Sequence, residues 1–223
     1  PCHWAGEYET NMNNRRTLKT ELGVFETFNP QLPDSLRSVP YVLLANIAPA
    51  LQNHVLDQMR RPKFVIADTM DLWLNTARSE LLRLLRRVDA FVLNDSEARL
   101  LTGDNNLISA VAKIHRLGPE YVIAKKGEHG SLLSSPEGLF LAPAFPLRRV
   151  IDPTGAGDSF VGGLAGWLAS ASGPIRGKLK RAMVYGSVVA SFCCEGFGLT
   201  RTLRIDRSQI ENRVKLLERL ARF

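Results

Sequence analysis

The chain has 223 residues, of which 45% are hydrophobic and 23% charged, and this composition excludes a disordered or fibrous protein. No apolar run approaches the roughly 20 residues of a membrane span, and the first residues do not have the pattern of a secretory signal. The three cysteines, Cys2, Cys193 and Cys194, lack the pattern of a disulfide framework. We therefore expect a cytoplasmic protein without a membrane partner.

The net charge of +7 is compatible with a protein that binds nucleic acid, so this function has to be considered. The basic residues are interleaved with acidic ones along the predicted helices, and the tight clusters are short, at residues 60–61, 83–87 and 178–181. Solvated helix faces explain most of these clusters, and attraction of a phosphorylated small molecule explains the rest equally well. We therefore expect no nucleic-acid partner. The four histidines are scattered without the spacing of zinc ligands.

Residues 1–28 form the first predicted unit of the chain. They are polar, and three segments within them place β-branched and aromatic residues at alternate positions, at 4–8, 16–20 and 23–28. This period of two predicts the strands of a small sheet, and a disordered leader is the alternative.

Residues 29–223 alternate between strand and helix patterns. The predicted strands are the apolar runs at 41–46, 63–67, 88–93, 121–125, 131–134, 139–141 and 147–151. The predicted helices are the segments at 49–59, 72–85, 96–101, 106–117, 174–194 and 207–222, and one that begins near residue 156. This alternation predicts an α/β fold with a mostly parallel sheet covered by helices on both faces.

Polar side chains follow the predicted parallel strands. They are Asn46, Asp68, Asn94, Glu97 and Lys125. The carboxyl ends of parallel strands meet at one edge of the sheet, and ligands of open α/β sheets bind there. The pattern therefore predicts that these side chains surround a ligand site.

Residues 150–160 read V-I-D-P-T-G-A-G-D-S-F and lead into the helix that begins near residue 156. Pro153 ends regular strand pairing, and Gly155 and Gly157 permit a tight turn that leaves backbone N–H groups open to a ligand. N–H groups at the start of a helix bind anions together with the helix dipole. Asp158 is then either a helix cap or a base beside a bound anion. The spacing fits neither the dinucleotide fingerprint nor a Walker A loop.

The string D-P-T-G-A-G-D-S-F-x-G-G resembles the C-terminal signature of the ribokinase-like, or PfkB-type, sugar and nucleoside kinases. The resemblance implies a three-layer α/β sandwich in which residues 29–223 form the kinase core and residues 1–28 a partial β lid. It implies an ATP-dependent phosphotransferase in which Asp158 takes the proton from an acceptor hydroxyl. The amides that would form an anion hole for the transferring phosphoryl group are those of Gly155, Ala156 and Gly157.

Two shorter motifs resemble parts of the nucleotide site in the same family. Asn94 and Glu97 match N-x-x-E, which implies binding of phosphate and Mg²⁺, with Glu97 on a metal-bound water. A helix cap made by Asp95 or Ser96 is the alternative. The second motif, K-x-G-x-x-G, implies a turn that borders the nucleotide, and a solvated lysine in a hairpin is the alternative. Its residues are Lys125, Gly127 and Gly130.

The resemblance to the PfkB-type kinases also implies roles for four further residues. Gly186 lies on the predicted helix that would stand behind the adenine. Asp152 and Thr154 would bind the monovalent cation, such as K⁺, that many relatives contain. Asp68, with Trp73, resembles a D-x-x-x-x-W stretch of the family, where the carboxylate either contacts substrate or metal-bound water or caps a helix.

The implied partners are ATP and a small sugar or nucleoside, and the sequence does not choose between these acceptors. Trp4, Tyr8 and Phe25 could stack on a nucleobase, and packing within the small sheet explains them as well. Lids of relatives often pair between subunits, which implies a homodimer. The opening strands and the Gly-Gly substrate motif of the family have no match in this chain, so we expect its N-terminal segment to be missing. The alternative function is therefore a truncated, non-catalytic nucleotide- or ligand-binding relic of the same fold.

Overall fold

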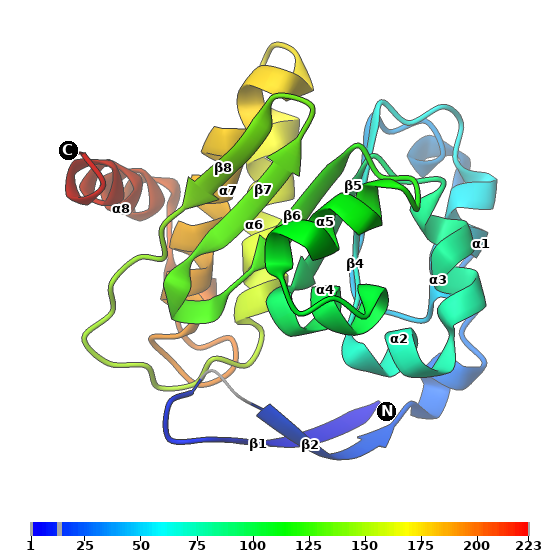
Figure 1. Cartoon of the computed structure of the whole chain (residues 1–223), viewed down its shortest axis with the longest axis horizontal. Helices are drawn as coiled ribbons and strands as arrows, with labels where there is room; N and C mark the ends of the chain where they lie inside the picture. Colours follow the sequence, from blue (N-terminus) through cyan, green and yellow to red (C-terminus); the bar gives the residue numbers. More distant parts are fainter. Residues whose placement is uncertain (1, 13–14, 223) are drawn as a thin grey trace.

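The protein, described here by a computed structural model of residues 2–12 and 15–222, contains two separate sheets (Figure 1). Residues 1, 13 and 14 of the predicted lid, and residue 223, lie outside the described residues. The larger sheet has the strand order β3 (Tyr41–Leu44), β4 (Phe64–Asp68), β5 (Ala90–Asn94), β6 (Tyr121–Lys125), β7 (Ser131–Ser135) and β8 (Gly138–Ala142). The smaller sheet pairs β1 (His3–Tyr8) with β2 (Arg15–Glu21).

The larger sheet is parallel from β3 to β6 and antiparallel from β6 to β8. Parallel neighbours need a crossover, and helices supply it here. The helices between β3 and β6 are α1 (Pro49–Gln58), α2 (Asp71–Thr76), α3 (Arg78–Leu85), α4 (Asp95–Thr102) and α5 (Leu107–His115). The mostly parallel α/β sheet predicted from the alternating pattern is therefore confirmed.

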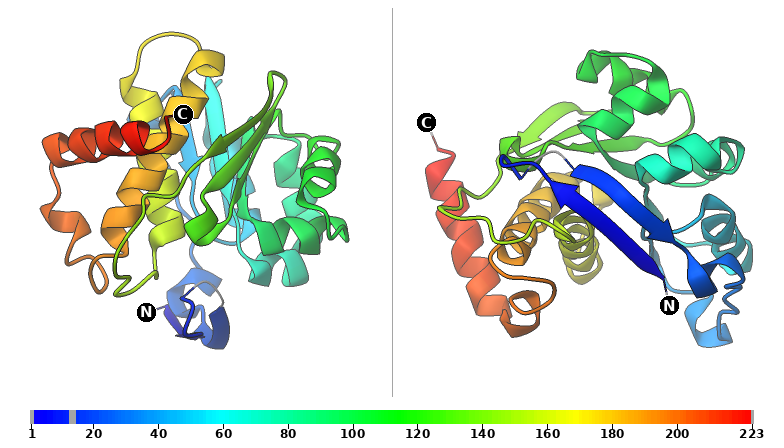
Figure 2. Two further views of the ribbon diagram at one scale, coloured as in Figure 1. Left: turned by 60° about the vertical axis from the view of Figure 1, so that its left-hand side comes forward. Right: turned by 90° about the horizontal axis from the view of Figure 1, so that it is seen from below.

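Helices cover both faces of this sheet (Figures 1 and 2). The helices from α1 to α5 pack on one face, while α6 (Ala156–Ser170) and α7 (Ile175–Cys193) pack on the other. Strand β5 shows why: Phe91 and Leu93 join the first core cluster, Ala90 and Val92 join the second, and all four are 0% exposed. A strand buried on both faces is apolar at every position. Helix α8 (Arg207–Leu220) packs against α7 and completes the predicted three-layer sandwich.

The β1–β2 hairpin forms the small antiparallel lid that the sequence predicted. It lies below the core in Figure 1, at the end of the molecule where α6 begins. A register shift between Ala5 and Gly6 bulges β1. At the end of β1, the Tyr8 hydroxyl accepts a hydrogen bond from Thr154 Oγ1 at 3.3 Å. The lid therefore contacts the residues that lead into α6.

The prediction of a third lid strand at residues 23–28 is wrong. Residues Gly23–Glu26 form a short 3-10 helix instead. Gly23 has a φ of 53°, in the left-handed region that turns the backbone away from an extended path. The rings of Phe25 and Phe28 then pack on each other, with centroids 6.1 Å apart, instead of alternating across a sheet. Further 3-10 turns are Asp34–Leu36, Gly127–His129 and Thr202–Arg204.

The strand predicted at residues 147–151 is also wrong. The backbone after β8 is irregular, because Pro143 and Pro146 lack the N–H groups that another ladder requires. The Ile151 N–H instead donates to the carbonyl of Cys194 at 2.8 Å. This hydrogen bond joins the segment before the glycine loop to the end of α7.

The helix predicted at residues 72–85 consists of two helices, α2 and α3. Ala77 lies between them with φ −133° and ψ 34°, which is outside the helical region. Its N–H ends α2 by donating to the Trp73 carbonyl at 3.0 Å, and its carbonyl accepts the first bond of α3 from Leu81. The indole of Trp73 donates to Asn46 Oδ1 at 2.9 Å, so α2 is tied to the carboxyl end of β3.

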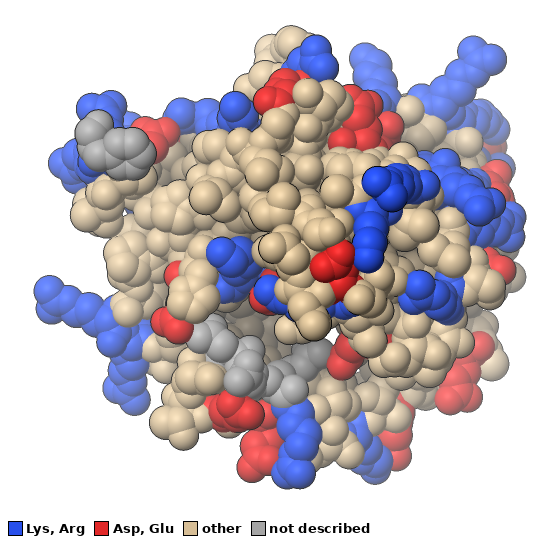
Figure 3. Space-filling view, in the orientation of Figure 1, with Lys and Arg blue, Asp and Glu red and all other residues tan. Residues whose placement is uncertain are grey.

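Acidic and basic side chains are interspersed on the face drawn in Figure 3, as their interleaving in the sequence predicts. Ion pairs join neighbouring segments: Arg87, in the turn after α3, pairs with Asp57 of α1 at 2.8 Å, and Arg181 of α7 pairs with Glu218 of α8 at 2.9 Å. Within residues 2–12 and 15–222, no helix combines the length and the hydropathy needed to cross a bilayer.

Close packing of α6 against α7 depends on glycine. A Cβ on Gly186 would lie 2.7 Å from the carbonyl oxygen of Phe160, and a Cβ on Gly163 would lie 2.9 Å from the Val189 side chain. Because Phe160 is in the first turns of α6, Gly186 allows α7 to support the start of that helix. This packing contact explains the glycine at position 186.

We expect Gly186→Ala to lower the free energy of unfolding by about 1–3 kcal/mol, because the added methyl group overpacks the contact with Phe160. Gly177→Ala is the matched control, since Gly177 lies in the same helix with open space around its Cβ position. The control should gain about 0.5–1 kcal/mol from helix propensity. Urea unfolding of both variants measures the difference. Equal stability changes in the two variants would contradict the packing explanation.

Candidate active site

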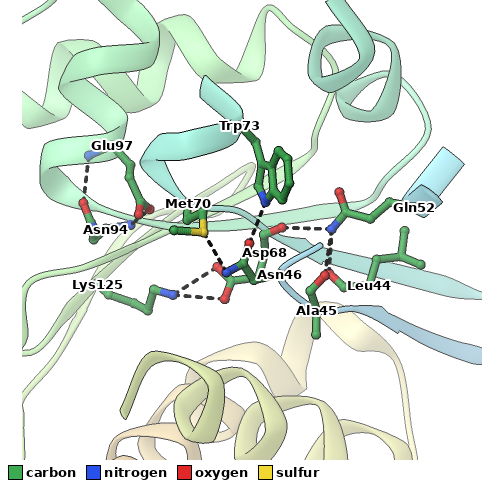
Figure 4. A network of polar contacts seen from close by, with 10 residues as sticks. All are labelled: Leu44, Ala45, Asn46, Gln52, Asp68, Met70, Trp73, Asn94, Glu97 and Lys125. Atoms are coloured by element: carbon green, nitrogen blue, oxygen red, sulfur yellow. Dashed lines mark hydrogen bonds and ion pairs between the residues drawn. The ribbon is translucent and has the colours of Figure 1, made fainter. Parts of the chain in front are cut away.

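Side chains from four elements converge at the carboxyl edge of the parallel sheet (Figure 4). Asp68 ends β4, Asn94 ends β5, Lys125 ends β6, and Glu97 lies in the first turn of α4. The start of α6 faces the same place, because a Cβ on Gly157 would lie 3.2 Å from Lys125 Nζ. The predicted grouping of polar residues at this edge is therefore confirmed for these residues.

Lys125 and Asp68 form an ion pair across the end of β5. The Lys125 ammonium donates to both oxygens of Asp68, at 3.0 Å and 3.2 Å. The side chains are only 17% and 5% exposed. Burial raises the pKa of Asp68 above its ordinary value, the Lys125 charge opposes that rise, and the charge of Asp158 adds to it. Asp158 is thus within electrostatic reach of the pair.

Asn94 and Glu97 form a reciprocal cap on α4. Asn94 Oδ1 accepts from the Glu97 N–H, and Glu97 Oε2 accepts from the Asn94 N–H, both at 2.7 Å. The alternative in which Asp95 or Ser96 caps this helix is therefore wrong, since Asn94 occupies the cap. Glu97 is 5% exposed, and burial raises its pKa to about 7 against the lowering effect of Lys125. The N-x-x-E motif thus holds a buried, weakly acidic carboxyl group beside the ion pair.

Glu97 makes the stability of the protein depend on pH. Between the ordinary pKa of 4.5 and the folded value of about 7, the unfolded chain has lost this proton while the folded chain keeps it. Rising pH therefore lowers the free energy of unfolding, by at most about 1.4 kcal/mol per pH unit, and the effect levels off above pH 7.

Glu97→Gln retains an acceptor for the cap but cannot ionise. We expect the variant to gain stability relative to the native protein as pH rises from 5 to 7, and the gain to stay constant above that range. Urea unfolding at pH 5, 6, 7 and 8, with a metal chelator present, measures this gain. A difference that does not change with pH would contradict the raised pKa.

The glycine loop adopts the helix start that the sequence predicts. Gly155 is the N-cap of α6, with a φ of 82° that favours glycine, and no side chain caps this helix. The Ala156 N–H donates to the Pro153 carbonyl at 3.0 Å, which closes the turn. The N–H groups that follow in the first turn of a helix have no partner inside the helix, so they are available to an anion. Asp158 is exposed in this first turn and does not cap the helix.

Asp152 and Thr154 form a separate turn before the loop. Asp152 Oδ1 accepts from the Thr154 N–H at 2.9 Å. Partial burial would raise the pKa of Asp152, but hydrogen bonds from Thr154 and from the Gly198 backbone lower it below the ordinary value. Cys193 Sγ donates to the Thr154 carbonyl at 3.4 Å and supports the turn from behind. The described residues contain no group of three or more His, Cys, Asp or Glu side chains arranged for a metal ion.

A surface cavity of about 420 Å³ lies beside the segment before this turn. Phe145, Leu147, Arg148, Ile151 and Glu195 are among its lining residues, and Asp158 and Lys125 are not. We place the candidate active site at the sheet edge instead, because the charged groups and the helix start converge there.

The sequence profile of the pfkB family carbohydrate kinases matches residues 12–205. The chain belongs to this family. Its curated relatives include a bifunctional ribokinase/ribose-5-phosphate isomerase A of Fructilactobacillus sanfranciscensis, 35% identical over 54% of this chain and 22% of the relative. They also include a cytidine kinase of Thermococcus kodakarensis, 38% identical over 40% of this chain and 34% of the relative. The matched segments thus span only 22% and 34% of these two relatives' own length.

Solved structures of the pfkB family's ribokinase-like fold superpose on the chain. The nucleoside kinase of Methanocaldococcus jannaschii gives a TM-score of 0.71 at 19% identity, over 95% of this chain and 67% of that one. The ribokinase of Arabidopsis thaliana, complexed with ribose and ATP, gives a TM-score of 0.64 at 26% identity, over 79% of this chain and 56% of that one. The fold predicted from the sequence is therefore confirmed.

The remaining positions that the pfkB resemblance indicated lie at different places. Gly127 and Gly130, with φ values of 57° and 81°, form the turn that follows Lys125. Gly186 is buried in the contact with Phe160, so the structure does not group it with the charged residues. Asp68 does not cap a helix, because Met70 precedes α2 and Asp68 binds Lys125. Sequence reasoning identified both members of this ion pair but missed their contact.

Proposed function

We propose that the protein is an ATP-dependent kinase that transfers the γ-phosphoryl group to a hydroxyl of a sugar or nucleoside. The observation that supports this most strongly is the exposed Asp158 in the first turn of α6, beside a glycine loop in which Gly157 lies next to the Lys125 ammonium. A carboxylate there can accept a proton, while the helix start and the ammonium attract phosphate oxygens. The matched pfkB profile favours phosphoryl transfer as the reaction.

Asp158 acts as the general base in this proposal. It takes the proton from the acceptor hydroxyl as the oxygen attacks the γ-phosphorus, and the bond to the ADP oxygen breaks. The amides of Gly155 and Gly157 hold the phosphoryl oxygens, together with that of Ala156, which also donates to the Pro153 carbonyl, and Lys125 contributes a positive charge beside them. Gly127 and Gly130 shape the turn next to the nucleotide. The chain's own residues thus supply a base, donors and orientation.

The residues near Lys125 fit a hard cation such as Mg²⁺. Glu97 is a buried carboxyl group, and the buried Thr69 hydroxyl has no hydrogen-bond partner among the described residues. Oxygen donors of this kind suit Mg²⁺, which keeps several of its waters. Bound with ATP, the ion would offset phosphate charge, with Asn94 and Glu97 holding its water shell. Asp152 and Thr154 would hold a monovalent cation such as K⁺ through oxygen atoms.

An ADP-release assay tests the proposed function. The acceptor panel is ribose, fructose, 2-dehydro-3-deoxygluconate, cytidine and aminoimidazole riboside, each with and without Mg²⁺. We expect Mg²⁺-dependent ADP release with at least one acceptor. Calorimetric binding of ATP without turnover of any acceptor would support the non-catalytic relic, and absence of ATP binding would contradict both.

We also propose that the lid joins two copies of the chain. A sheet of two strands is marginally stable in water, and pairing with the lid of a second copy would extend it. Leu18 on β2 is 57% exposed and would be covered in such a pair. Sedimentation velocity over a range of concentrations tests the dimer. A monomer at every concentration would count against it.

A further inference from the structure

The ion pair between Lys125 and Asp68 does not connect neighbouring strands. Asp68 ends β4 and Lys125 ends β6, with β5 between them in the sheet. The lysine side chain crosses the end of β5 to reach both carboxylate oxygens (Figure 4). Backbone ladders already hold these strands together. We therefore take the main effect of the ion pair to be on the Lys125 side chain, which it fixes at the edge of the sheet.

The position of the ammonium is electrostatically unfavourable without Asp68. The start of α6 carries the positive end of the helix dipole. Lys125 Nζ lies close to this helix end, because a Cβ on Gly157 would be only 3.2 Å from it. An ammonium group next to a positive helix end is repelled toward solvent. Asp68 supplies the opposite charge at 3.0 Å, and it is held in place at the buried end of β4.

Resting on the proposed function, we infer that Asp68 is a positioning residue that holds the Lys125 ammonium beside the glycine loop before the nucleotide binds. A lysine ammonium has three N–H donors, and Asp68 accepts two bonds from it. The remaining donor can reach a terminal phosphate oxygen held by the amides of α6. Asp68 thus acts on the phosphate only through Lys125.

Calorimetry with β,γ-methylene-ATP and with ADP, both in Mg²⁺ buffer, tests this role. We expect Lys125→Met and Asp68→Asn each to weaken binding of the ATP analogue by about 10-fold or more, and to change ADP binding less. The double variant should bind no more weakly than Lys125→Met alone, because Asp68 has no separate effect. Asp89→Asn is the control: Asp89 is a partly buried acid that accepts from the Val65 N–H at the start of β4, and its loss should not alter affinity.

Losses that add in the double variant would overturn the inference, and so would equal losses for ADP and the ATP analogue. A native protein that binds neither nucleotide would instead contradict the proposed function, so the two failures are distinguishable. Thermal unfolding monitors whether each variant is folded.

Amine labelling of the native protein provides a test that needs no variant. Peptide mass spectrometry compares the acetylation rate of Lys125 with that of the exposed Lys215. We expect Lys125 to react more slowly because Asp68 holds its ammonium, and to be protected further by Mg²⁺ and β,γ-methylene-ATP. Equal rates for the two lysines, with no effect of the nucleotide, would overturn the inference.

Discussion

Asp158→Asn is expected to lower kcat by about 10²–10⁴-fold while ATP affinity changes little, because asparagine cannot accept the acceptor's proton. The variant keeps the glycine loop, and α6 has no side-chain cap to lose. The lost negative charge in the first turn lowers stability by only about 0.3–1 kcal/mol. Steady-state ADP release with an acceptor from the panel, together with calorimetric ATP binding, measures the two effects separately.

Asp206→Asn is the matched control for this experiment. Asp206 caps α8, accepts from the Gln209 N–H at 2.8 Å, and can be replaced by asparagine with the cap intact. It removes a negative charge at a helix start without touching the candidate active site, so turnover should stay at the native level. Near-native kcat in Asp158→Asn would rule out the general base.

Gly130→Ala is expected to lower the free energy of unfolding by about 2–5 kcal/mol, from backbone strain and overpacking together. Gly130 has a φ of 81°, and a Cβ there would overlap the Ala142 carbonyl oxygen and approach the Ala144 nitrogen at 3.0 Å. The carbonyl of Gly130 accepts from the Lys126 N–H at 2.8 Å, so the turn beside Lys125 would move. Urea unfolding measures stability, and calorimetry measures the accompanying loss of nucleotide affinity.

Gly138→Ala separates strain from steric overlap. Gly138 also has a positive φ, 101°, but nothing lies within 4 Å of its Cβ position. The control should lose only the strain contribution, about 1–2 kcal/mol, and should bind nucleotide normally. Equal effects of the two substitutions would show that the contact with Ala142 is unimportant.

Most helices and strands of the core could be predicted because the pattern of apolar residues in each segment is compatible with only one type of element. Strands such as β5 are apolar at every position before the last residue, which burial on both faces explains. The glycine loop was predictable as a helix start because Pro153 restricts the backbone and Gly155 permits the left-handed turn that follows. The strand predicted at 147–151 failed because apolar residues do not show whether a neighbouring strand has room and donors. Pro143 and Pro146 were the available signal.

The sequence indicated which residues lie in the candidate site better than it indicated which of them contact one another. Asp68 and Lys125 were identified as strand-end residues, but their contact depends on strand order, since β5 lies between β4 and β6. The cap formed by Asn94 and Glu97 follows a recognisable spacing, and the sequence assigned the cap to the wrong residue. Gly186 shows the reverse case, because a helical glycine has the same appearance in sequence whether it faces a ligand or another helix.

The contact between Gly186 and Phe160 links reaction geometry to a residue outside the charged cluster. Phe160 follows the proposed base by two positions, so the backbone that aims the carboxylate is clamped by the neighbouring helix. Proton transfer tolerates misalignment poorly, and a shift of about 1 Å can slow a reaction 10²-fold. Substitutions on the buried face of α7 that displace Phe160 should consequently lower the rate of the proposed reaction as well as the stability of the fold.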